Sequence, residues 1–179
     1  METENWSKSL GAEYATDEPE FMCELGRAMA EWGNVEHALS SVFAVAIQSK
    51  DPFLARASFH SIVGFRDRLR AVETLIAMQS KRNLTDFWKE VHLEWKRIDD
   101  ILSKASKKRN RLAHMHVWQG PEIGTFGAQN ITGLADLPLD PVARKKEVVT
   151  IALMRDYRRS FCIAADRVYK LQERLTNAG

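Results

Sequence analysis

The sequence has little of what marks a secreted, membrane-spanning or disulfide-stabilised protein. Its 179 residues include only two cysteines, Cys23 and Cys162, which lie far apart, so we expect reduced thiols. No apolar run approaches the roughly 20 residues that a membrane span needs. Residues 1–20 carry six acids and one lysine, the reverse of the charge of a secretory or mitochondrial leader. These absences predict a cytoplasmic protein with no membrane association.

Net charge and chain-breaking residues are also scarce. The formal net charge is only +2, so any affinity for nucleic acid has to come from a local basic patch. Of the 9 glycines and 5 prolines, four and three respectively fall in residues 115–150, which marks loops. We therefore predict an acidic tail over residues 1–20 and one domain over residues 21–179, with an excursion at residues 115–150.

Apolar residues recur every three or four positions in four segments, which is the period of an amphipathic helix. The first seam contains one charged residue, Glu36: Met22, Leu25, Met29, Trp32, Glu36, Leu39, Phe43 and Ala46. The second predicted helix begins with Asp51 as its N-cap and Pro52 as its first residue, and it ends near Asn83. Its seam contains Ser58, Ile62, Phe65, Leu69, Val72 and Ile76. The third runs through Trp88, Val91, Trp95, Ile98, Leu102, Ala105, Arg109 and Leu112. The fourth covers about residues 150–177.

Four helices with one apolar stripe each predict an all-α fold, an antiparallel four-helix bundle. The excursion between the third and fourth helices is predicted to contain a β-hairpin. Residues 116–118, which include His116 and Trp118, would open the first strand of this hairpin. The return strand would lie at residues 125–126 or 130–132.

Several common catalytic motifs are absent. The sequence has no GxxxxGK[ST], GxGxxG, GxSxG or HExxH motif, which argues against the common nucleotide-hydrolysing, Rossmann, serine-hydrolase and zinc-peptidase classes. His114 and His116 alternate, but no cysteine or carboxylate pair lies nearby to complete a metal site. We expect neither a metal nor a cofactor.

The segment from Ser103 to His116 carries the functional signal. It reads SKASKKRNRLAHMH and contains five cations and no acid. Cations at a helix C-terminus can simply complement the helix dipole, and the alternative is an RNA-binding patch. Arg109 differs from the others because it occupies a seam position where leucine is expected, so it must be paired or face a cavity or a second subunit. The five cations are Lys104, Lys107, Lys108, Arg109 and Arg111.

Arg109-Asn110, followed by Ala113-His114, resembles the signature of the HEPN superfamily, in which four to six residues separate an arginine from a histidine. In that family the motif lies near the end of the third helix of a four-helix bundle, where this sequence places it. The segment EWGNVEHAL in the first helix is similar to one in some members. The resemblance covers residues 21–177, although the excursion at residues 115–150 matches nothing that we can assign.

The resemblance implies a metal-independent endoribonuclease of the toxin or phage-defence type. Arg109 would hold the phosphate, His114 would transfer protons, and Asn110 would orient either group. The family also implies a homodimer, in which two Arg109/His114 sets form one composite site. An antitoxin or regulatory protein is a further implied partner.

Some assignments stay open at the sequence level. His116 shares a helix face with Arg109 and competes with His114, and Arg111 shows the same four-residue gap to His116. Glu36 either pairs with Arg109 or Arg66, or lies on the wet margin of its helix. Trp118 either stacks on a base or packs on the bundle, whereas Trp32, Trp88 and Trp95 are predicted core residues. Two other functions remain: a non-catalytic module that binds RNA or a nucleotide, and a helical dimerisation adaptor.

Overall fold

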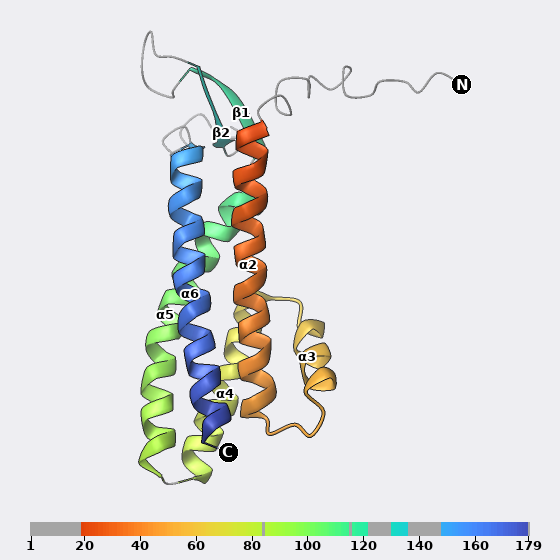
Figure 1. Cartoon of the computed structure of the whole chain (residues 1–179), viewed down its shortest axis with the longest axis vertical. Coiled ribbons are helices and arrows are strands. Elements are labelled where there is room, and N and C mark those ends of the chain that lie inside the picture. The colour runs from red at the N-terminus through yellow and green to blue at the C-terminus, as the bar shows by residue number, and fades with distance from the viewer. Residues whose placement is uncertain (1–18, 84, 115, 122–129, 136–147, 179) are drawn as a thin grey trace, which may run out of the picture. The chain divides into compact units, whose positions relative to one another are not determined.

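The computed structural model describes residues 19–83, 85–114, 116–121, 130–135 and 148–178 (Figure 1). This part of the chain is mostly helical, as predicted. The predicted acidic tail lies outside the described residues except for Pro19 and Glu20, which are helical. The elements are α2 (Pro19–Ala46), α3 (Pro52–Ser61), α4 (Phe65–Arg82), α5 (Asp86–His114), β1 (His116–Pro121), β2 (Asn130–Ala135), β3 (Val149–Thr150) and α6 (Ile151–Asn177).

The chain divides into two compact units. The first comprises residues 1–29 and 109–158, and the second comprises residues 30–108 and 159–179. The first unit therefore contains the small sheet, the beginnings of α2 and α6, and the end of α5. The second contains α3, α4 and the remainder of the three longer helices.

The first unit contains the predicted β-hairpin. β1 pairs antiparallel with β2, in a register that runs from His116 opposite Ala135 to Pro121 opposite Asn130. The predicted return strand at residues 130–132 is thereby confirmed. A third strand, β3, was not predicted, and it pairs with β2 at the other edge, where Leu134 lies opposite Val149.

In the second unit, α2 and α4 run in the same direction. The ring centroids of Trp32 and Phe65 lie 4.6 Å apart. Further along both helices, the Gln79 Nε2 atom donates a hydrogen bond to the backbone oxygen of Ala46 at 2.9 Å. Residue numbers thus rise together along both helices, so the predicted antiparallel order is wrong for this pair.

The parallel pair results from a break in the predicted second helix. Its N-cap is confirmed, because the Asp51 carboxylate accepts hydrogen bonds from the backbone nitrogens of Phe53 and Leu54 at 2.9 and 3.1 Å. The helix ends at Ser61, and a new helix begins at Phe65 after the extended N-cap Gly64. Two helices therefore replace the predicted single helix.

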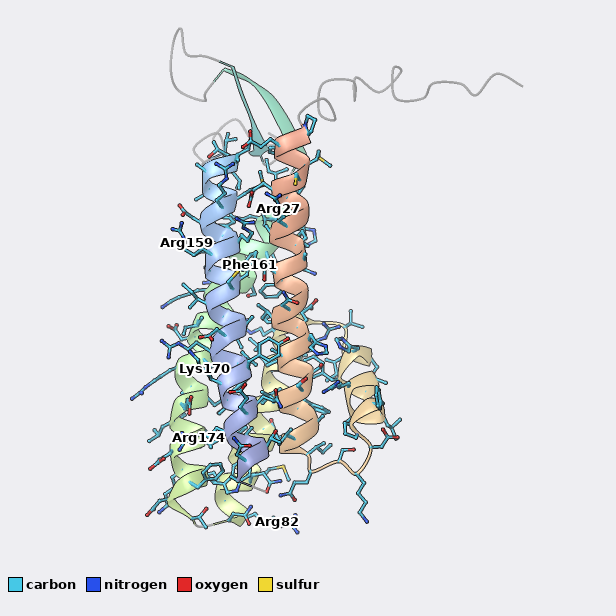
Figure 2. The ribbon with its side chains drawn as sticks, viewed as in Figure 1. Arg27, Arg82, Arg159, Phe161, Lys170 and Arg174 are labelled. Atoms are coloured by element: carbon cyan, nitrogen blue, oxygen red, sulfur yellow. The ribbon has the colours of Figure 1, made fainter. Side chains whose placement is uncertain are left out.

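α5 and α6 run in opposite directions in the second unit, as predicted. The Lys108 Nζ atom donates to the Ser160 hydroxyl at 3.0 Å. The Arg174 guanidinium, labelled in Figure 2, donates to Glu94 at 2.8 Å and also to Glu90. Residue numbers therefore fall along α6 as they rise along α5.

The predicted seams of α5 and α6 form much of the core. In α5, Trp95 is fully buried and Trp88 is half-buried. The labelled Phe161 of α6 contacts Trp32 of α2, with ring centroids 5.4 Å apart (Figure 2). At the start of α2 the predicted seam is shifted by one residue, because Met22 is 44% exposed and Phe21 is buried instead.

Within the described ranges, no helix combines the length and the apolar character that crossing a bilayer requires. Cys23 and Cys162 are both exposed, and no disulfide joins them.

Candidate active site at the end of helix α5

Arg109 lies in the last two turns of α5, at the seam position between the buried Ala105 and Leu112. Its side chain is half-buried, and its Nη1 atom donates a hydrogen bond to the Asn110 Oδ1 atom at 3.2 Å. A guanidinium at this position keeps its charge and its fork of donors where a leucine would only fill space.

Asn110 connects Arg109 with the face of the helix that carries His114. Residues four apart on a helix are surface neighbours, so Asn110 and His114 share a face. Arg109 and His114 are five apart, which places them about 140° apart around the helix. Asn110 therefore contacts Arg109 and shares a helix face with His114, whereas helix geometry points the arginine and the histidine in different directions.

His114 is the last residue of α5 and is exposed. Among the residues that the structure describes, its imidazole makes no hydrogen bond or ion pair, so both ring nitrogens are open to a ligand. His116 is the first residue of β1, and α5 ends two residues earlier. The expectation that His116 shares a helix face with Arg109 is therefore wrong. The side chains of His116 and Trp118 lie outside the described part.

Arg111 contacts α6. Its Nη1 atom donates to the hydroxyl of Tyr157, and its Cζ atom lies 5.8 Å from the centroid of that ring. Tyr157 is buried, so the contact fixes the position of the guanidinium. The prediction of an RNA-binding role for Arg111 remains a prediction, but this arginine also joins two helices.

A buried carboxylate near the start of α2 was missed by the sequence analysis. The Glu24 side chain is only 3% exposed, and its Oε1 atom lies 3.0 Å from the Arg158 Nε atom. Its Oε2 atom lies 3.7 Å from the Arg155 Nε atom and 3.8 Å from the Nη1 atom of Arg27, which is labelled in Figure 2. Glu24 follows Phe21 by three residues, which places both on one face of a helix. This spacing was the signal in the sequence that Glu24 could be buried.

The three predicted RNA-binding lysines of α5 belong to the second unit. The Lys104 Nζ atom pairs with Asp100 at 2.6 Å, and Lys108 donates to Ser160. Lys107 is exposed and makes no ion pair within the described residues. Of these lysines, Lys107 is the most available to an external anion.

Glu36 has a different partner from those predicted. Its Oε1 atom accepts a hydrogen bond from the Arg68 Nη1 atom at 2.7 Å. The predicted pairing with Arg66 or Arg109 is therefore wrong. Arg68 also donates to the backbone oxygen of Ile62 at 2.7 Å, which shows that this ion pair holds the connection between α3 and α4.

Over the described ranges, no group of three or more histidine, cysteine, aspartate or glutamate side chains is arranged to hold a metal ion. No family model, no curated protein and no solved structure matches this chain.

Proposed function

We propose that this chain is a metal-independent endoribonuclease of the HEPN type, with a toxin or defence role. One observation carries the proposal. An exposed imidazole at the end of α5 shares a helix face with Asn110, and Asn110 accepts a hydrogen bond from Arg109. A proton-transfer group therefore lies beside an amide that is in contact with a phosphate-binding cation.

These groups suit RNA cleavage because RNA carries its own nucleophile. The 2′-hydroxyl oxygen forms a bond to the adjacent phosphorus, and the bond from phosphorus to the 5′-oxygen breaks. A base takes the proton of the 2′-hydroxyl, and an acid gives a proton to the leaving 5′-oxygen. The products are a 2′,3′-cyclic phosphate and a 5′-hydroxyl. Imidazole suits both proton roles near neutral pH, and a guanidinium stabilises the charge on phosphorus.

We also propose a four-helix framework and a homodimer for this protein. We take α2, α4, α5 and α6 as the four helices of a HEPN-like bundle, with the parallel α2–α4 pair as a departure from a fully antiparallel order. One chain supplies one His114, whereas the reaction needs both an acid and a base. A two-fold homodimer would place two sets of Arg109, Asn110 and His114 over one RNA strand. An antitoxin or regulatory partner would restrain this activity.

The first test compares site variants with matched exposed residues elsewhere. His114→Ala and Arg109→Ala should each lower RNA cleavage by about 100-fold or more, because each removes a group that acts in the transition state. The controls His37→Ala and Arg82→Ala remove exposed side chains of the same types and should leave cleavage unchanged. Cleavage is measured on labelled RNA in the presence of EDTA, and the product ends are identified by mass.

Three outcomes would contradict the proposal. Cleavage that requires added metal would exclude the mechanism. RNA binding without cleavage, with a steep dependence on salt, would indicate a non-catalytic binding module. Neither binding nor cleavage would indicate a helical adaptor. His116→Ala is included in the series, because loss of activity there but not in His114→Ala would move the proton-transfer role to the start of β1.

A further inference from the structure

The second unit contains a groove of about 530 Å³ between α5 and α6, which is within the size range of small-molecule sites. None of the residues of the proposed RNA site lines it. Its walls come from one face of α5 and from Arg167 and Arg174 of α6. Since α5 and α6 are antiparallel, Arg174 lies toward the Glu90 end of the groove, and Arg167 lies toward the Ile101 end.

At one end of the groove the charged lining residues form an ion-pair network. Arg174 donates to both Glu94 and Glu90, and its Cζ atom lies 5.3 Å from the centroid of the Phe87 ring. The hydrogen bonds that Arg174 donates to Glu94 and to Glu90 raise its pKa above the ordinary value. One guanidinium faces two carboxylates here, so this end of the groove has a net charge of −1 and offers no free cation.

Three apolar side chains of α5 also line the groove. Ile98 is buried, Ile101 is half-buried, and Leu93 is 60% exposed. A leucine this exposed beside two isoleucines offers surface that would gain by being covered.

Beyond Glu94, each wall of the groove contributes one arginine. Arg97 of α5 and Arg167 of α6 both line the groove and are exposed. Neither makes an ion pair or hydrogen bond with any residue that the structure describes. The groove thus combines two arginines that form no ion pair with the described residues, a lining of net positive charge, and an adjacent apolar surface.

We propose that this groove binds a small phosphomonoester with an apolar body. A phosphomonoester carries close to two negative charges at neutral pH, which matches two guanidiniums, and arginine forks fit phosphate oxygens. The body of the ligand would cover Leu93, Ile98 and Ile101. A carboxylate carries only one charge, and an extended nucleic-acid strand would have to pass the carboxylates of Glu90 and Glu94.

The test uses naphthyl phosphate as the probe and isothermal titration calorimetry on the full-length protein at low salt. Arg97→Gln and Arg167→Gln should each weaken binding about tenfold, because each removes one charge-assisted contact. Leu93→Ser should weaken binding several-fold through the lost apolar cover. The control Lys96→Gln removes one exposed positive charge from the same helix outside the groove and should leave the affinity within twofold.

The arms of this test separate the head group from the body of the ligand. Naphthyl phosphate should bind at least tenfold more tightly than inorganic phosphate, which lacks the body, and than naphthoate, which lacks the second charge. Equal affinity for either reference compound, or equal weakening in Lys96→Gln, would overturn the proposal. Because His114 lies outside the groove, His114→Ala should bind the probe like the wild type. Binding of the probe therefore tests the groove independently of the ribonuclease proposal.

Discussion

At the scale of single residues, Arg68 shows how one side chain stabilises a turn of the chain. Its guanidinium donates to the Glu36 carboxylate and to the backbone oxygens of Ile62 and His60, the last at 3.3 Å. Its Cζ atom also lies 5.5 Å from the centroid of the Phe59 ring. One side chain thus satisfies carbonyls at the end of α3 and ties α4 to α2.

We expect Arg68→Met to lower the free energy of unfolding by about 2–3 kcal/mol, because it leaves the Glu36 carboxylate and two carbonyls without their donor. Arg68 is only 14% exposed, so water replaces these bonds poorly. Arg70→Met is the matched control. Arg70 is 71% exposed and pairs with Asp67 at 3.5 Å, and its loss should cost at most about 0.5 kcal/mol. Urea denaturation followed by far-ultraviolet circular dichroism measures both, and equal losses would contradict the role given to Arg68.

We expect Asp99 to make the stability of the protein depend on pH. Burial raises the pKa of its carboxyl above the ordinary value, and the nearby carboxylates of Glu73 and Asp100 raise it further. The His92 Nε2 atom lies 3.2 Å from the Glu73 Oε1 atom. A raised pKa means that the folded state binds the proton more tightly than the unfolded state does. The contribution of Asp99 to stability is therefore complete below the pKa of the unfolded chain and is lost as pH rises through the folded pKa.

Asp99→Asn should accordingly gain stability relative to the wild type as pH rises. The two proteins should differ least at about pH 3, below the unfolded pKa of about 3.9, and the variant should be the more stable at pH 7. Urea denaturation of both proteins at each pH gives the difference in their free energies of unfolding. A constant difference at every pH would show that Asp99 titrates alike in the folded and unfolded states.

The sequence could identify charged residues in apolar seams but could not identify their partners. Glu36 stood out because its neighbours in the seam are apolar, and it is indeed paired. Its partner is Arg68 and not Arg66, because residues two apart on a helix point about 200° away from each other. Which of the two faces α2 depends on where α4 begins, and the break at residues 62–64 sets that starting point.

At the scale of elements, periodicity predicted α5 and α6 well because each has one continuous buried seam. Periodicity wrongly predicted one continuous helix across α3 and α4. Ile62 and Phe65 continue the spacing of three to four residues, although α3 ends at Ser61. Local signals there amount to Gly64 alone. The contacts that hold the break are distant in sequence: Phe65 on Trp32, and Arg68 on Glu36. Such contacts between helices override local helix propensity.

Two glycines should respond in opposite ways to alanine. A Cβ atom on Gly133 of β2 would lie 2.4 Å from the Val148 Cγ1 atom and 2.9 Å from the backbone oxygen of Val149. Because a backbone atom cannot move aside easily, Gly133→Ala should lower the free energy of unfolding by about 1–3 kcal/mol. Gly26 lies within α2 with nothing within 4 Å of such an atom, so Gly26→Ala should raise it by about 0.5–1 kcal/mol.

Urea denaturation measures the free energy of unfolding of both variants. Amide hydrogen exchange in β2 and β3 shows whether Gly133→Ala acts on these strands. A tolerated alanine at position 133, with unchanged protection of Val149, would mean that β3 does not pack against β2 as described.

At the scale of the whole molecule, the candidate site was predicted in part. The motif from Arg109 to His114 was found because its residues are neighbours in sequence, on one helix. Glu24 with Arg158, and Arg111 with Tyr157, were not found because each pair joins helices that are far apart along the chain. Periodicity indicates that such a residue is buried, but it does not indicate what the residue meets.

The proposed composite site predicts how activity depends on mixing. If cleavage needs His114 from both copies, wild type refolded with a ninefold excess of His114→Ala should keep only about 1% of its activity per total protein, because one dimer in about a hundred has two intact chains. Independent sites would instead keep about 10%, in proportion to the wild-type fraction. Refolding with the same excess of His37→Ala should leave full activity, which controls for losses during refolding. Activity proportional to the wild-type fraction would show that one chain supplies both the acid and the base, and the reason for a shared site would be gone.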